Sequence, residues 1–505
     1  MKRLLFLSHR WLGIVLCLFM ALWFLSGVVM MYVGYPKLGA AERLSTLPAL
    51  PEATCCVGVD RILGVLPPGA QPRSLRLTSV AGQPTFIVGL EKKRYLAIDG
   101  STGQPRGKLG EADAVAAARA FLPGQPATYR GPVHEDAWTH SRALDGHRPL
   151  HRVEMDGSAD GAGKSLLYVS GSTGEVVRDA SATERTWNWL GAWLHWLYPL
   201  RGGVLDGWWT GIVVYTSLAA TVLAASGMVV GILRWRRRPY ASGSRSPYRK
   251  ALWRWHHWLG LVFGVLTLTW IFSGLLSVNP WKVFDSDAPR PKLPQLELRA
   301  NSASASIADA LARFRENGLS ARELEWLPFA GKIYLLARDG QGASRLSFWD
   351  NGSPVLAAFE PASLETAGRA LLPQAPLSKA SLQEAYDWHY YRRASQSMSG
   401  HQEKPLPVLR LEFGDTAHTW LYLDPKSGAL IQRLDDRLRL KRWLFALFHS
   451  WDWLPLLENR PLWDVLLIVA SLGGFLLSLS GLFIGLRRLP RRRQPAQARV
   501  VANQW

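Results

Sequence analysis

The sequence predicts a membrane protein with four transmembrane helices that come from two parallel repeats, together with two α+β regions outside the membrane. Three observations support this prediction. Apolar residues concentrate in four runs, the two halves of the chain repeat each other, and basic residues cluster beside the ends of the runs. Each run is long enough to cross a bilayer at about 1.5 Å per residue. The runs lie near residues 11–33, 207–233, 258–279 and 462–486.

The first half of each repeat opens with the same motif. His9-Arg10-Trp11-Leu12-Gly13 starts the first run, and His256-His257-Trp258-Leu259-Gly260 starts the third, 247 positions later. Because this motif recurs inside the chain, we interpret the first run as a retained helix and not as a cleaved secretory signal. The same offset relates Trp23 to Trp270 and Ser26-Gly27 to Ser273-Gly274.

The second half of each repeat matches at an offset of 254 positions. His195 pairs with His449 shortly before the second and fourth runs. Each copy therefore carries two matched histidines, one beside each of its two runs. The other matches are Tyr168 with Tyr422, Gly174 with Gly428, Trp209 with Trp463, Ser226-Gly227 with Ser480-Gly481, and Gly231 with Gly485.

The formal net charge of +20 indicates the orientation in the membrane. Lys and Arg, without Asp or Glu, occupy residues 2–10, 234–250 and 487–493. Positive residues near span ends stay on the cytoplasmic side. Both termini and the central link are therefore predicted to be cytoplasmic, and the two long loops to lie outside. This interpretation explains all three clusters without a nucleic-acid partner.

Each long loop reads as a small α+β unit. In the first loop, short strands are predicted at 85–88, 95–98, 166–169 and 175–177, and a helix at 111–122. The second loop predicts helices at 307–317 and 382–392, strands at 333–337 and 344–349, and a strand-turn-strand unit at 421–431. The predicted units are 1–34, 35–185, 186–240, 241–280, 281–440, 441–490 and the basic tail 491–505.

Several segments of the chain form an ordered set: Asp424-Pro425-Lys426-Ser427-Gly428, Arg442-Trp443-Leu444-Phe445, His449-Ser450-Trp451-Asp452, Arg460-Pro461-Leu462-Trp463 and the two His-x-Trp-Leu-Gly motifs. Together they resemble the PepSY-associated transmembrane family, over essentially the whole chain. The resemblance implies that the two loops are periplasmic PepSY-like regions. Members of that family include inner-membrane reductases that release iron from ferric siderophores, and some are similar to dihaem proteins.

The four matched histidines are the candidate ligands. Neutral imidazole is inexpensive to bury and is a good axial ligand for haem iron. Two parallel copies related by an axis along the membrane normal would place His9 opposite His256 near the cytoplasm, and His195 opposite His449 near the outer surface. We therefore expect two bis-histidine sites, each holding a non-covalent haem b, because no Cys-x-x-Cys-His motif is present.

Other residues of the spans fit this hypothesis or a plainer one. Gly13, Gly260, Gly27, Gly274, Gly227 and Gly481 would leave space beside the histidines, although small residues in spans also serve close helix packing. Trp23 and Trp270 would fill the space between the two levels. Arg185, Arg201 and Arg442 are candidate partners for propionates or an anionic substrate, or headgroup anchors.

The remaining histidines and the cysteines carry weaker predictions. We assign His257 to the surface or to a propionate, and expect Tyr386, His389, Tyr390 and His401 to line an acceptor site. Cys55 and Cys56 are interpreted as two thiols and not as a strained vicinal disulfide. The loop histidines show no recurring metal-ligand spacing and are interpreted as solvated: His134, His140, His147, His151, His389, His401 and His418.

The predicted function is a transmembrane haem-dependent ferric reductase in a bacterial inner membrane. Electrons would pass from a cytoplasmic donor, either a separate protein or a reduced flavin, to a periplasmic ferric siderophore, with release of ferrous iron. Two alternatives stay open. A siderophore permease would need polar residues along the spans, which contain almost none, and a non-redox PepSY regulatory or assembly protein would be colourless.

Overall fold

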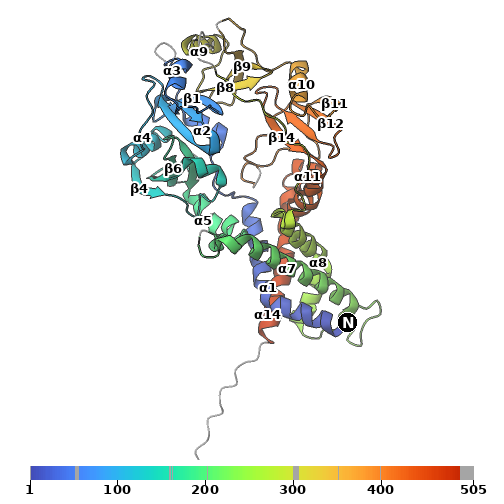
Figure 1. Ribbon diagram of the computed structural model, residues 1–505. Helices are drawn as coiled ribbons and strands as arrows, with labels where there is room; N and C mark the ends of the chain where they lie inside the picture. The colour runs from blue at the N-terminus through green and yellow to red at the C-terminus, as the bar shows by residue number, and fades with distance from the viewer. Residues whose placement is uncertain are drawn as a thin grey trace, which may run out of the picture.

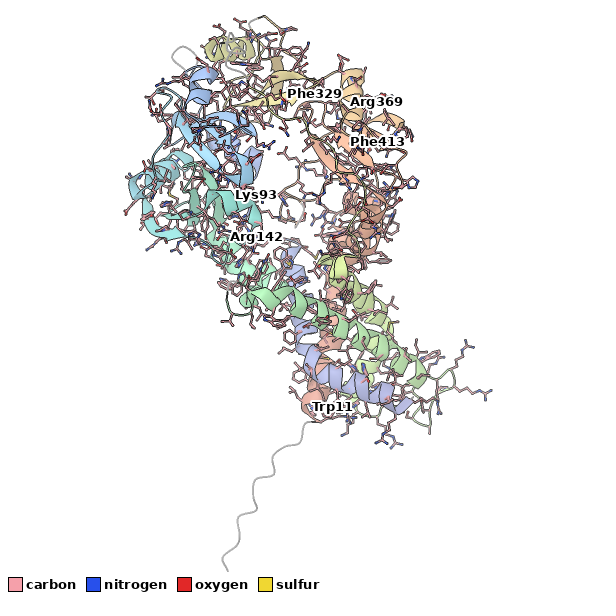
Figure 2. The ribbon with its side chains drawn as sticks, viewed as in Figure 1. Trp11, Lys93, Arg142, Phe329, Arg369 and Phe413 are labelled. Carbon is pink, nitrogen blue, oxygen red and sulfur yellow. The ribbon has the colours of Figure 1, made fainter. Side chains whose placement is uncertain are left out.

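The computed structural model describes residues 2–51, 56–158, 161, 163–201, 203–298, 306–350, 352–397 and 400–488. Figure 1 shows a helical bundle with two β-rich regions above it that meet each other at the top. We call these regions head 1 (residues 35–185) and head 2 (residues 281–440). The N-terminus lies at the end of the bundle farthest from the heads. Figure 2 shows Trp11 on the bundle and Arg142, Phe329, Arg369 and Phe413 in the heads.

Four long helices form the bundle, and all four are long and apolar enough to span a membrane. Helix α1 packs against α7 and α14, and α8 packs against the same two helices, so the four close into a ring. Leu16, Met20 and Leu223 pack inside the ring, whereas Tyr215 and Val262 are exposed on its outside, as lipid-facing surfaces require. The helices are α1 (Lys2–Met30), α7 (Trp209–Arg234), α8 (Ala251–Ser277) and α14 (Leu462–Leu486).

Short helical segments connect the heads to the bundle. They make tight turns at the boundary, where backbone groups can bond to one another or reach water. The segments are α5 (Ala182–Leu190), α6 (Ala192–His195), η3 (Tyr198–Leu200), η4 (Asp206–Trp208), η5 (Pro280–Lys282), α11 (Asp436–Lys441), the π-helix η7 (Arg442–Leu447), α12 (Phe448–Ser450) and α13 (Leu454–Glu458).

A six-stranded antiparallel sheet joins the two heads, with strand order β10-β9-β8-β1-β2-β3. The junction is the pairing of β1 with β8, which places Leu75 opposite Trp326. Both residues are buried in a common core with Phe86 and Phe314. The strands are β1 (Ser74–Val80), β2 (Gln83–Gly89), β3 (Tyr95–Asp99), β8 (Glu323–Phe329), β9 (Lys332–Arg338) and β10 (Ser344–Phe348), and the nearby helices are α2 (Ala40–Thr46), α3 (Val59–Gly64), η1 (Glu91–Lys93) and α9 (Ile307–Glu316).

Each head also contains a four-stranded meander, with strand orders β4-β5-β6-β7 and β11-β12-β13-β14. The last hairpin of each meander turns at a glycine with positive φ, 76° at Gly174 and 69° at Gly428, a conformation that side chains disfavour. Head 1 contains β4 (Ala127–Val133), β5 (Leu150–Met155), β6 (Ser165–Ser170), β7 (Val176–Ser181), α4 (Glu111–Phe121) and η2 (Arg142–His147); head 2 contains β11 (Leu377–Gln383), β12 (Val408–Phe413), β13 (Trp420–Leu423), β14 (Leu430–Leu434) and α10 (Pro361–Arg369).

A buried ion network crosses the junction between the heads. Glu323 on β8 is 2% exposed and accepts hydrogen bonds from Arg43 at 2.6 Å and Arg76 at 2.7 Å. The Arg76 guanidinium also donates to Glu175 at 2.8 Å. Since Arg43, Arg76 and Glu175 belong to head 1, the network links three of its segments to a strand of head 2.

Two expectations from the sequence need correction. The helix expected over 382–392 is absent, because the segment is the end of β11 followed by irregular chain. Cys56 is disulfide-bonded and not a free thiol, and Cys55 lies outside the described residues. The sequence also did not predict the sheet that the two heads share.

Candidate functional site

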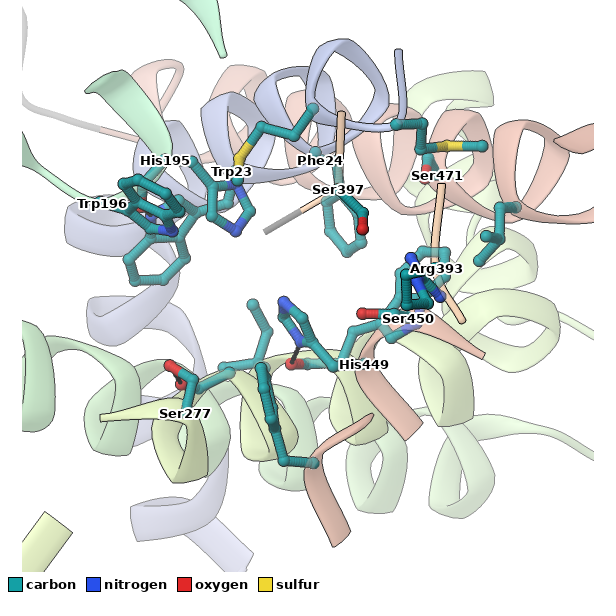
Figure 3. A pocket seen from close by; sticks show the side chains of 18 of the residues that line it. Trp23, Phe24, His195, Trp196, Ser277, Arg393, Ser397, His449, Ser450 and Ser471 are labelled. Atoms are coloured by element: carbon teal, nitrogen blue, oxygen red, sulfur yellow. Dashed lines mark hydrogen bonds between the residues drawn. The ribbon is translucent and has the colours of Figure 1, made fainter. Parts of the chain in front are cut away.

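Two histidines meet where the heads join the bundle. The ring centres of His195 and His449 are 6.1 Å apart, and Figure 3 shows the two imidazoles facing each other across an open space. Burial lowers the pKa of His195 to about 3 and also lowers that of His449, because a charged imidazole is costly away from water. Both rings are therefore neutral at physiological pH, with lone pairs available for a ligand.

Irregular backbone brings both of these histidines to the bundle. The chain breaks at Gly191 between α5 and α6, and His195 ends α6. The π-helix η7 precedes α12, which carries His449. Two residues after each histidine the backbone turns left-handed, at Leu197 (φ 53°) and Trp451 (φ 49°). Such conformations are uncommon for large residues and are concentrated at functional sites.

A second histidine pair lies at the other end of the bundle. The ring centres of His9 on α1 and His256 on α8 are 6.4 Å apart. The histidines predicted to face each other are therefore neighbours at both ends. Because α1 and α8 are diagonal in the ring of four helices, these two side chains meet in the bundle interior.

A Ser-Gly pair on a neighbouring helix holds three of the four imidazoles, and each of these contacts uses Nδ1. Ser26 lies 3.0 Å from Nδ1 of His195, Ser273 lies 3.2 Å from Nδ1 of His449, and Ser480 lies 2.9 Å from Nδ1 of His256. At the fourth, Nδ1 of His9 lies 3.3 Å from the carbonyl oxygen of Leu223, which also accepts from Ser226.

These contacts fix the orientation of the rings. The carbonyl oxygens of Leu223 and Trp270 can only accept, so Nδ1 of His9 and of His449 must donate to them. A neutral imidazole that donates from Nδ1 has a free lone pair on Nε2. This arrangement is typical of histidines that bind metals.

The glycine of each Ser-Gly pair lies against the imidazole edge. A Cβ at Gly227 would lie 2.7 Å from Cε1 of His9, and one at Gly481 would lie 3.2 Å from Cε1 of His256. At the head end, a Cβ would come within 3.7 Å of His195 at Gly27 and within 3.3 Å of His449 at Gly274. Gly227, Gly274 and Gly481 therefore leave room for the imidazole rings, and a Cβ at Gly27 would make only ordinary contact. From the sequence, this space was assigned to a macrocycle. Gly13 and Gly260 do not, because they face Leu223 and Leu477 in helix packing.

A cavity of about 360 Å³ surrounds the pair at the head end. Its lower wall is largely apolar, with Ile271 and Leu467 from the spans, and Trp23 and Trp270 line it at the level of the histidines. Its upper wall contains three arginines, Arg392, Arg393 and Arg460. The cavity therefore changes from apolar to cationic between the bundle and the heads.

Head 2 supplies part of this upper wall through residues 391–397, which we call the strap. Arg393 forms an ion pair with Asp452, which also accepts from Tyr391 at 2.7 Å. The strap then reaches the end of α1, where the Gln396 amide donates to the Met31 carbonyl oxygen at 3.2 Å. The side chains of Arg392, Arg393 and Ser397 line the cavity.

Other candidate residues lie away from the cavity. Arg442 is buried between Tyr391 and the Asp452 carbonyl oxygen, and Arg201 pairs with Asp206 at 3.5 Å. Like Arg185, neither lines the cavity. The cationic residues that do line it, Arg392, Arg393 and Arg460, were missed because a loop of unknown path carries the first two. The basic Arg392-Arg393 doublet was the available signal.

His257 is buried and not at the surface, which was the first of its two assignments. It is 6% exposed, and its two nitrogens lie 2.9 Å from the Ser246 hydroxyl and the Gly231 carbonyl oxygen. Tyr390, expected at an acceptor site, is fully buried and stacks on Tyr422. Both residues are therefore structural.

The loop histidines mostly bind protein groups. His140 lies 2.6 Å from Glu135, His151 lies 2.8 Å from Tyr129 and His401 lies 3.0 Å from Lys37. Several are thus buried or bonded, and not solvated as expected. No group of three or more potential metal ligands occurs among the described residues.

Comparison with known proteins adds one finding. No curated protein matches the chain. A family profile described as "PepSY-associated TM region" matches residues 6–327, which is more than half of the chain and includes His9, His195 and His256. The chain therefore belongs to the PepSY-associated TM region family.

Proposed function

We propose that the protein is a transmembrane electron carrier with two b-type haems, held by His9 with His256 and by His195 with His449. The supporting observation is the geometry of the two pairs, with ring centres 6.4 and 6.1 Å apart. Metal–imidazole bonds of about 2 Å put the centres of two rings on opposite sides of one metal ion roughly 6 Å apart. If the imidazoles only packed against each other, nothing would require the same ring-centre distance at both ends of the bundle.

The cavity at the head end supports the same proposal. Its apolar wall and its cationic rim suit a planar apolar macrocycle with carboxylates at one edge. The tryptophans and the spans would keep water away from the iron, which shields the reduced state. Bound haem supplies reversible one-electron chemistry, and the protein residues supply ligation, ring orientation and a low dielectric.

The residues of the chain have defined tasks in this function. Ser26, Ser273 and Ser480 hold Nδ1 of their histidines, which leaves Nε2 of each ring free for a ligand. The four glycines beside the rings let the helices approach closely enough for each pair to form. The two sites lie at opposite ends of the same bundle, which divides the crossing into two shorter transfers.

The proposed orientation rests on charge. Basic residues cluster at the bundle end that carries the N-terminus and the link between α7 and α8, which supports a cytoplasmic location for that end and a periplasmic location for the heads in a bacterial inner membrane. A cytoplasmic donor, a protein or a reduced flavin, is oxidised by one electron. A ferric siderophore outside accepts that electron, and its iron is released as ferrous ion. The acceptor class rests on the resemblance to ferric-siderophore reductases.

An absorption spectrum of the detergent-purified protein tests the proposal. We expect a sharp α band on reduction with dithionite, two haems per chain by pyridine haemochrome assay, and one haem in His9→Leu and His449→Leu. A ferric-chelate reduction assay with proteoliposomes then tests the acceptor. A protein that stays colourless after reconstitution with haem would overturn the proposal and favour the non-redox alternative.

A further inference from the structure

The cavity at the head end presents hydrogen-bond donors without acceptors. The indole nitrogen of Trp270 and the hydroxyl of Ser397 are buried, and neither has a hydrogen-bond partner within the described ranges. Trp270 as a whole is 8% exposed and Ser397 is 9% exposed. Both residues line the cavity. A buried donor without a partner is costly, so these groups indicate a ligand that carries acceptor oxygens.

The charge on the cavity wall also indicates a ligand with acceptor oxygens. Arg393 is neutralised by Asp452, and Arg460 by Asp464 at 2.5 and 2.8 Å. Neither of these aspartates lines the cavity. Arg392 also lines it, yet forms no ion pair with any residue that the structure describes. One net positive charge therefore remains on the upper wall, at the exposed Arg392, and the strap residue Ser397 lines the same cavity.

The strap is fixed to both halves of the chain. Arg393 anchors it to Asp452, which follows His449, and Gln396 anchors it to α1. A Cβ at Gly34 would lie 2.1 Å from the Gln396 carbonyl oxygen, so glycine is needed where the strap crosses the chain beyond α1. These contacts hold the strap, and with it Arg392, at the wall of the cavity that surrounds the histidine pair.

We infer that the strap is a carboxylate-binding lid on the head-end site. Arg392 and the Ser397 hydroxyl bind the carboxylates of the macrocycle held by His195 and His449, which rests on the function proposed above. The occupancy and the reduction potential of this site are therefore set in part by head 2, whereas the site of His9 and His256 lies beyond the reach of the strap. In this arrangement Arg392 and Ser397 would hold the carboxylate edge of the macrocycle, and Ile271 and Leu467 would contact its apolar part.

The first test measures the two reduction potentials separately. Arg392→Gln removes the unpaired charge, and we expect the potential of the His195–His449 site to fall because a nearby cation stabilises the reduced state. The His9–His256 site should keep its potential. The single-site variants His9→Leu and His449→Leu assign the two components. Arg119→Gln, an exposed arginine on α4, is the matched control.

The second test changes the ligand. Haem dimethyl ester lacks the carboxylate charges, so the wild-type head-end site should bind it about tenfold more weakly than haem, the loss expected for one charge-assisted hydrogen bond. Arg392→Gln should show no such preference. Gly34→Ala, which displaces the strap with its charge intact, should resemble Arg392→Gln, and Gly107→Ala, where a Cβ meets open space, should not.

The results separate the inference from the proposed function. A wild-type protein without haem would refute both. A protein with two haems, in which Arg392→Gln leaves the head-end potential unchanged or shifts both potentials equally, would refute the lid alone. Equal affinity of the wild-type site for haem and for its dimethyl ester would do the same.

Discussion

The hydroxyl of Ser480 on α14 lies 2.9 Å from Nδ1 of His256 on α8. The same relationship joins Ser26 to His195 and Ser273 to His449. Each serine stands directly before the glycine that lies against the same ring. In these three Ser-Gly pairs, the serine binds Nδ1 of an imidazole from a neighbouring segment and the glycine leaves space for the ring.

Removal of the Ser480 hydroxyl should weaken the site of His9 and His256. Without its hydrogen bond, His256 loses its fixed tautomer and ring orientation, and such changes reduce metal affinity by roughly 10- to 100-fold. Haem titration of Ser480→Ala measures this loss. Ser478→Ala is the control, because Ser478 lies on the same helix and its hydroxyl donates only to the Gly474 carbonyl oxygen. Equal losses in both variants would contradict the predicted role.

A methyl group at Gly227 should empty the same site. The Cβ of Gly227→Ala would lie 2.7 Å from Cε1 of His9, so the imidazole must move away from His256. We expect the haem content to fall from two per chain to one, with the component at the head end unchanged. Gly211→Ala on the same helix meets open space and should retain two haems. Retention of both haems by Gly227→Ala would show that the contact is not needed.

Neutralisation of Glu323 should destabilise the junction of the heads. Glu323→Gln leaves Arg43 and Arg76 partly unpaired in a buried position, and loss of one member of a buried ion pair costs about 3–5 kcal/mol. Thermal unfolding monitored by tryptophan fluorescence should show a transition at a lower temperature in Glu323→Gln than in the wild type. Glu325→Gln, which removes a half-buried partner of Arg338 on the same strand, should change stability by about 1 kcal/mol or less. A similar change in the unfolding temperature of both variants would contradict the predicted role of Glu323.

The same network predicts a pH dependence of stability. Burial alone would raise the pKa of Glu323 and of Glu175, but the guanidinium groups of Arg76 and Arg43 outweigh it and hold both pKa values below the ordinary range. The unfolded chain therefore binds more protons than the native state, and stability rises with pH across this window. The contribution should be complete above the ordinary glutamate pKa of about 4.3 and be lost as the pH falls further.

Denaturation between pH 3 and 7 measures this effect. The loss of stability on acidification should be smaller in Glu323→Gln than in the wild type, since the variant has one fewer carboxylate to protonate. Parallel curves for the two proteins would mean that other groups dominate acid unfolding.

Local signals in the sequence predicted much of the fold. The four spans, the α4 and α9 helices and the hairpin turns at Gly174 and Gly428 follow from apolar length, periodicity and glycine placement. The proximity of His9 to His256 and of His195 to His449 followed from the repeat, because equivalent residues of parallel copies face a common axis. Their role as haem ligands stays a prediction.

Long-range contacts set the rest. The pairing of β1 with β8 depends on a register between strands that are far apart in the sequence, which neither strand encodes alone. The segment 382–392 has a helical pattern, yet it leads into the strap, whose residues Arg393 and Gln396 bind Asp452 and the Met31 carbonyl oxygen. Arg392 and Arg393 could not be assigned to the cavity without the path of that loop.

Because the two heads share a sheet, the two halves of the chain are joined at both ends of the molecule. One half of the chain touches the other in the membrane and again in a single sheet at the far end. Any rotation that separated the facing imidazoles would have to shear that sheet. Two separately expressed halves should therefore find each other and reassemble, and a lone half should expose an unpaired strand edge and self-associate.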